Sequence, residues 1–137
     1  MSLIKLLLVW LLLAVLMICN GIFRVIVLQP RFGDGVAEAL SAALGIVIIL
    51  LVTRPFLRPL AGATAPELAV ISVAWVVLTV IFEFTFGHWV DGKSWSELAA
   101  NYAIWRGRLW LIVLAALAAA PFIWTRGAPV RSRTRTR

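Results

Sequence analysis

Three ionisable side chains lie inside the long apolar segments at the end of the predicted bundle opposite the termini. Arg24, Glu38 and Glu83 each fall three or four residues from the end of a predicted helix. At 1.5 Å rise per residue this is a depth of about 5–6 Å, and the depth is the same for all three. Because residues of opposite charge lie at the same depth, we expect Arg24 to pair with Glu83, Glu38 or both.

Two interpretations of this cluster remain open. The first is a structural clamp that fixes the register of neighbouring helices. The second is a binding or conducting site open to the outer face, because ionisable residues inside a membrane are candidates for function. The candidate binding set also includes polar residues of the segment 82–108, namely His88, Asp91, Asn101, Tyr102, Arg106 and Arg108.

A metal site or a catalytic site is a weaker alternative. Glu83, His88 and Asp91 carry groups that bind divalent ions, and His88 could act as a general base on a lipid at the outer leaflet. However, the i, i+5 spacing of Glu83 and His88 requires the helix to break near Gly87. The sequence carries no Ser–His–Asp order, phosphate-binding loop or HExxH motif. We therefore predict neither a metal nor a cofactor.

The composition places these residues in a membrane protein. Of the 137 residues 63% are apolar and 14% are charged, against about 45–50% and about 25% in soluble domains. Because this apolar excess makes lipid the expected surroundings of most of the surface, we predict no nucleic-acid partner from the net charge of +7, much of which lies in the C-terminal RSRTRTR. The single cysteine, Cys19, excludes an intrachain disulfide.

The pattern of apolar runs predicts an all-α bundle of four transmembrane helices in one domain, residues 1–126. The first helix is expected to end at Gln29–Pro30, and Pro55 and Pro59 are expected to stop the second. Small residues at Ala37, Ser41 and Gly45 form a ridge that favours packing within the chain, with dimerisation as the alternative. The four predicted spans are residues 3–28, 35–53, 65–87 and 108–125.

Two capping boxes, Thr64-x-x-Glu67 and Ser94-x-x-Glu97, mark the starts of helices. The second one opens a predicted amphipathic helix over residues 94–105, between the third and fourth spans. Its apolar face is formed by Trp95, Leu98, Tyr102 and Trp105. A helix of this length and pattern is too short to span, so we expect it to lie in the membrane interface.

The distribution of Lys and Arg predicts the orientation. The end with both termini carries eight positive residues and the opposite end five, and positive residues favour the cytoplasm. We therefore predict an integral plasma (inner) membrane protein with both termini cytoplasmic. Residues 127–137 are predicted to be a disordered basic tail.

These patterns leave two main hypotheses about function. The first is a non-catalytic accessory or self-assembling subunit, whose partners are the lipid bilayer and either further copies or a larger membrane complex. The alternative is a small transporter or flippase that uses Glu83 and Arg24 as a substrate or proton site.

Overall fold

The structure, a computed structural model, describes residues 1–100 and 109–126, and within them every regular element is a helix. The all-α class is thereby confirmed for the described residues, which contain no strand. The elements are α1 (Leu3–Phe23), a π-helical segment (Arg24–Leu28), α2 (Gln29–Phe32), α3 (Asp34–Leu57), a 3-10 turn (Arg58–Leu60), α4 (Ala65–Trp89), α5 (Trp95–Ala100) and α6 (Trp110–Thr125).

Three continuous helical stretches are long and apolar enough to cross a membrane. They are Leu3–Phe32, Asp34–Leu60 and Ala65–Trp89, with 30, 27 and 25 residues. In the most apolar window of each, 22% of the residues are buried in the protein, so most of the side chains are at least partly exposed and suit a lipid environment. The apolar helix α6 has only 16 residues, fewer than the roughly 20 of an average span.

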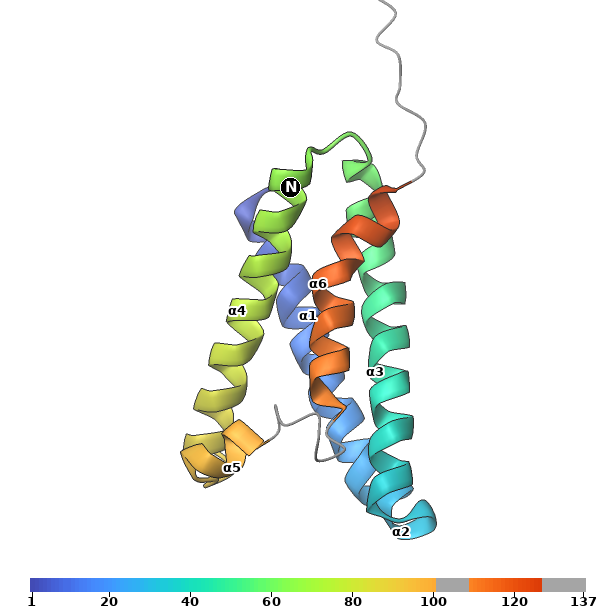
Figure 1. The fold of residues 1–137 in the computed structure, drawn as a ribbon, viewed down its shortest axis with the longest axis vertical. Helices are drawn as coiled ribbons and strands as arrows, with labels where there is room; N and C mark the ends of the chain where they lie inside the picture. Colours follow the sequence, from blue (N-terminus) through green and yellow to red (C-terminus); the bar gives the residue numbers. More distant parts are fainter. Residues whose placement is uncertain (101–108, 127–137) are drawn as a thin grey trace, which may run out of the picture.

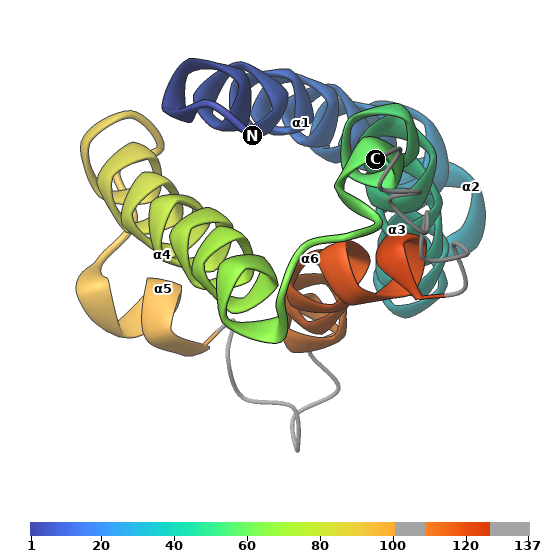
Figure 2. The same ribbon diagram turned by 90° about the horizontal axis from the view of Figure 1, so that it is seen from above.

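The four long helices form a ring in the order α1, α3, α6, α4 (Figure 2). α6 packs between α3 and α4, and α1 packs along α3. Figure 1 shows that the N-terminus and the end of α6 lie at one end of the molecule, whereas α2 and α5 lie at the other. Figure 1 also shows that α1 and α4 diverge toward the end that carries α2 and α5.

The ridge of small residues on α3 packs within the chain, as the first of the two interpretations predicted. Ala37, Ser41 and Gly45 are all buried. A Cβ on Gly45 would lie 2.9 Å from the Cε atom of Met17 on α1. The amide of Asn20, also on α1, donates a hydrogen bond of 2.9 Å to the Ser41 carbonyl. The missing side chain at Gly45 therefore allows the close approach of α1 and α3.

The predicted end of the first helix at Gln29–Pro30 is wrong, because the helix continues to Phe32. The backbone N–H of Gln29 bonds to the Arg24 carbonyl, five residues back. This wider π turn precedes Pro30, which lies in the first turn of α2 and lacks an N–H. The helix ends instead at Gly33, whose φ of 77° favours glycine.

The second and third helices also run further than predicted. Pro55 lies inside α3, so it does not stop the helix, and α3 ends at Leu57 just before Pro59. Leu57 is fully buried, and its packing holds the turn that follows Pro55. α4 continues through Gly87 to Trp89, and the absent Cβ of Gly87 leaves room for the buried side chain of Leu98 on α5.

The predicted helix over residues 94–105 is described only in its first part. α5 begins at Trp95 and is described to Ala100, and the predicted remainder lies outside the described residues. The predicted tail, residues 127–137, lies outside them as well. Both predicted capping boxes are present. Glu67 and Glu97 accept the backbone N–H groups of Thr64 and Ser94, each at 2.7 Å.

Candidate ligand-binding site

A cavity of about 890 Å³ lies between the helices, and Arg24, Glu38 and Glu83 all line it. They come from the π-helical segment, α3 and α4 respectively. The volume is within the roughly 300–1,000 Å³ of ligand-binding pockets. The structure therefore brings together three residues that the sequence related only by their depth.

The predicted ion pair between Arg24 and a carboxylate is not formed. No salt bridge joins Arg24 to Glu83 or to Glu38 in the described part of the chain. Glu38 instead accepts the backbone N–H of Leu109, just before α6, at 3.2 Å. Arg24 and Glu83 both line the cavity, and α4 diverges from the helix formed by α1 and its π-helical extension toward this end of the molecule (Figure 1).

Three polar atoms of the cavity wall are buried and have no hydrogen-bond partner among the described residues. They are Asn20 Oδ1, Arg24 Nε and Trp110 Nε1. A buried polar group without a partner costs about 1–3 kcal/mol. Asn20 is only 5% exposed, so its side chain already belongs to the interior. These three atoms are positions where a bound ligand would recover lost hydrogen bonds.

The local backbone sets the position of Arg24. The π-helical segment begins at this residue, and the Arg24 carbonyl accepts from Gln29 rather than from the residue four ahead. Such π turns interrupt regular α-helices and are frequent at functional sites. The change of pitch rotates the chain that follows and leaves the half-buried Arg24 side chain in the cavity wall.

Two tryptophans join α1 to α4 on the side of the cavity nearer the termini. Trp10 Nε1 donates to Thr79 Oγ1 at 3.0 Å, and Thr79 donates in turn to the Trp75 carbonyl at 2.8 Å. Trp75, which is fully buried, donates from Nε1 to the Leu6 carbonyl at 3.1 Å. Because Trp10 and Thr79 also line the cavity, this network closes the space between α1 and α4 above it.

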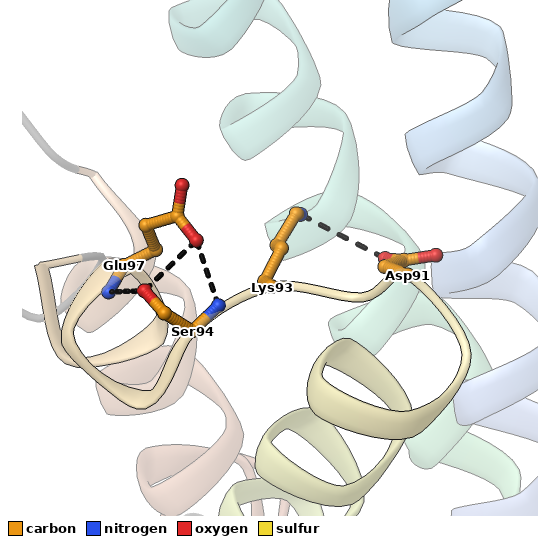
Figure 3. A network of polar contacts seen from close by, with 4 residues as sticks. All are labelled: Asp91, Lys93, Ser94 and Glu97. Atoms are coloured by element: carbon orange, nitrogen blue, oxygen red, sulfur yellow. Dashed lines mark hydrogen bonds and ion pairs between the residues drawn. The ribbon is translucent and has the colours of Figure 1, made fainter.

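The opposite side of the cavity is bordered by the segment between α4 and α5. Lys93 Nζ lies 3.7 Å from Asp91 Oδ2, and both side chains are about half exposed. Glu97 accepts from the Ser94 hydroxyl at 2.9 Å, and the Ser94 hydroxyl accepts the Glu97 N–H at 3.2 Å (Figure 3). Asp91, Lys93 and Glu97 line the cavity, so this border is polar, and each of its three charged side chains has a partner within the segment.

His88 lies apart from the cavity wall and holds the segment that follows α4. Its Nδ1 is 2.8 Å from the Lys93 carbonyl, so Nδ1 must carry the proton and donate it. Its ring stacks on Trp95 with centroids 3.9 Å apart. The helix does not break at Gly87, as a shared site of Glu83 and His88 would require. The described residues contain no group of three potential metal ligands.

Four of the predicted site residues, Asn101, Tyr102, Arg106 and Arg108, lie outside the described residues. The sequence analysis did not identify Trp10 and Trp110 as residues of the cavity wall. Trp110 was assigned to no site, and Trp10 stands in an uninterrupted apolar run, where nothing in the local sequence distinguishes it from a lipid-facing residue. Only the complementary position of Thr79 on α4 gives Trp10 its role.

The cavity therefore carries two charged side chains, Arg24 and Glu83, that have neither a hydrogen bond nor an ion pair with any described residue. It also offers unused donors and an unused acceptor in its wall. Such a site can bind a polar or charged group. No protein-family model, curated protein sequence or solved structure matches the chain.

Proposed function

We propose that this protein is a small transporter or flippase that takes a charged amphiphile into the cavity between its helices. One observation carries the proposal: Arg24 and Glu83 line a ligand-sized cavity without pairing with each other. A structural clamp requires the two to be in contact. Two separated and unpaired charges are costly in a membrane, and a ligand that contacts them offsets that cost.

The proposal includes a fourth span and a defined orientation. α6 packs along both α3 and α4, and its 16 residues extend about 24 Å at 1.5 Å per residue. Arg54 and Arg58 lie at the end with the N-terminus and the end of α6, and the basic residues after 126 follow α6 in the sequence. By the positive-inside rule this end faces the cytoplasm of an inner membrane, and α5 lies in the outer interface.

The divergence of α1 and α4 provides the route for the ligand. Exposed apolar side chains flank the cavity on both helices, with Ile22 53% and Ile81 55% exposed. An amphiphile could place its headgroup among the polar atoms of the cavity while its tail stays in the lipid. No such lateral route is needed for a purely water-soluble substrate.

The test is flux in liposomes that contain the purified protein. A fluorescent phospholipid in both leaflets is bleached from outside by an impermeant reductant, and accelerated loss of the inner-leaflet signal measures transfer. We expect Glu83→Gln and Arg24→Leu to reduce this rate about tenfold or more, which corresponds to about 1.4 kcal/mol. Asp34→Asn, an exposed carboxylate outside the cavity, should leave it unchanged. Wild-type liposomes with the rate of protein-free liposomes would contradict transport.

A second candidate is the accessory or self-assembling subunit. The same divergence of α1 and α4 favours it, because a helix of a partner or of a second copy could pack between them. Native mass spectrometry in mild detergent distinguishes the two. A stoichiometric protein complex without flux in liposomes would favour the subunit, whereas a monomer that retains lipid would favour the transporter.

A further inference from the structure

We propose that the ligand of this cavity is an amphiphile with a zwitterionic headgroup, in which an anionic phosphate or carboxylate lies next to an ammonium group. The inference rests on the proposed function, since it names the class of substrate for the same site. It follows from which charges of the cavity wall are already engaged and which are not.

Most charged groups of the wall have partners inside the protein. Asp91 forms an ion pair with Lys93, Glu97 accepts a hydrogen bond from Ser94, and Glu38 accepts one from the Leu109 backbone. These groups need nothing from a ligand. Among the described residues of the wall, the cation of Arg24 and the carboxylate of Glu83 are the two that remain.

One unpaired charge of each sign selects against singly charged ligands. A purely anionic headgroup would pair with Arg24 and bury Glu83 without a partner. A purely cationic headgroup would pair with Glu83 and leave Arg24 without a counter-charge. A headgroup of one sign displaces water from both charges but gives a counter-charge to only one of them, and a desolvated charge without a partner is costly. A zwitterion satisfies both charges at once, so it binds without that penalty.

The unpartnered hydrogen-bonding atoms predict how the headgroup is oriented. Arg24 Nε and Trp110 Nε1 are donors, so they suit the oxygens of a phosphate or carboxylate. Asn20 Oδ1 and the Glu83 carboxylate are acceptors, so each suits an N–H group of an ammonium. The headgroup therefore needs an ammonium that still carries hydrogens, as a primary amine does.

The apolar part of the cavity lining favours an amphiphile over a free zwitterion. The lining combines the polar atoms with apolar side chains such as Leu13, Ile18 and Val25. A free headgroup would leave this apolar surface in contact with water. An acyl chain covers it and adds about 0.8 kcal/mol for each CH₂ group that it buries.

The experiment measures binding to the full-length protein in detergent by isothermal titration calorimetry. Three probes share the same short acyl chains: a phosphatidylethanolamine, a phosphatidylglycerol and a diacyl trimethylammonium propane. Free phosphoethanolamine is the fourth probe. We expect the phosphatidylethanolamine to bind at least about tenfold more tightly than each of the other three. This ranking is obtained with the wild-type protein, so it does not depend on whether any variant folds.

Variants assign the selectivity to the two charges. Glu83→Gln should abolish the preference for the ethanolamine lipid over the glycerol lipid, and Arg24→Leu should abolish its preference over the cationic lipid. The matched controls, Asp34→Asn and Arg58→Gln, change exposed charges outside the cavity wall and should keep both preferences.

The outcomes separate this inference from the proposed function. Equal binding of the three lipids, or tightest binding of a singly charged one, would overturn the zwitterionic headgroup but leave a lipid-binding cavity. Absence of binding by all four probes would overturn the proposed function itself. Free phosphoethanolamine binding as tightly as the lipid would overturn the amphiphile and leave the headgroup chemistry.

Discussion

Arg24 and Glu83 are the residues on which the interpretation of this protein turns. Both sit in apolar helices, both line one cavity, and neither pairs with a described residue. A salt bridge would have explained them as elements of stability. Because no ion pair joins them, each contributes a desolvation cost that the protein alone offsets only in part. The structure therefore favours a ligand over a clamp.

The side chain of Glu97 stabilises the start of α5, and this effect should depend on pH. The pKa of Glu97 lies below its ordinary value of 4.5, because the carboxylate accepts hydrogen bonds from the Ser94 backbone and hydroxyl. A lowered folded-state pKa means that the stabilisation is present above the ordinary value and is lost as the pH falls through the folded-state value. Acid should therefore loosen α5.

Hydrogen exchange of the α5 amides, corrected for intrinsic rates, measures this effect. We expect constant protection from about pH 7 to about pH 5 and falling protection at lower pH. Ser94→Ala removes the hydroxyl partner of Glu97. The α5 amides of this variant should therefore be less protected than those of the wild type already at neutral pH. Protection that increased on acidification would show that the Glu97 carboxylate does not stabilise α5.

At the scale of elements, the contact between α1 and α4 decides where the cavity ends. The two helices are joined by hydrogen bonds from Trp10 and Trp75 on one side of the cavity, and they diverge on the other. The tie between Trp10 and Thr79 should therefore be measurable as a contribution to the stability of the bundle.

Thr79→Val removes the acceptor for Trp10 Nε1 while keeping the side-chain shape. We expect a destabilisation of about 0.6–1.7 kcal/mol, the range of hydrogen bonds between membrane helices. Reversible unfolding in mixed micelles measures it. Thr85→Val is the matched control, because the Thr85 hydroxyl bonds only to carbonyls of its own helix. Equal effects of the two changes would show that the tie to Trp10 contributes nothing.

The sequence predicted the existence of the helices better than their ends. Length and apolar character identified all three long helices, and both capping boxes were correctly located. Pro30 and Pro55 were misjudged because the missing N–H of proline costs only a local hydrogen bond. A π turn accommodates the first, and the buried Leu57 holds the turn after the second. The preference of proline for helix ends does not reveal these effects, because they depend on the folded structure around each proline.

At the scale of the whole molecule, the proposed orientation predicts which end is reached from outside. Cys19 is replaced by Ala, and single cysteines are placed at Ser96 in α5 or at Gly62 between α3 and α4. An impermeant maleimide should label the Ser96→Cys protein in intact cells. The Gly62→Cys protein should react only after permeabilisation, and the reverse pattern would invert the topology.

The site was only partly predictable at this scale. Equal depth along separate helices was enough to group Arg24, Glu38 and Glu83, since rise per residue is nearly constant. Whether grouped charges touch depends on how the helix axes diverge, and the sequence does not record the angle between α1 and α4. The cavity, and the roles of Trp10 and Trp110 in its wall, follow from that angle.

The most direct test of the ligand site is a double-mutant cycle on stability with Arg24→Leu and Glu83→Gln. If the two residues form a site rather than a clamp, each single change removes an unpartnered charge, so the ligand-free protein should be unchanged or more stable. Their coupling should be below about 0.5 kcal/mol, the lower end of the range for residues in contact, because no ion pair joins them. Single changes that each destabilise the bundle, with a double change that restores part of the loss, would contradict the ligand site and establish a structural ion pair.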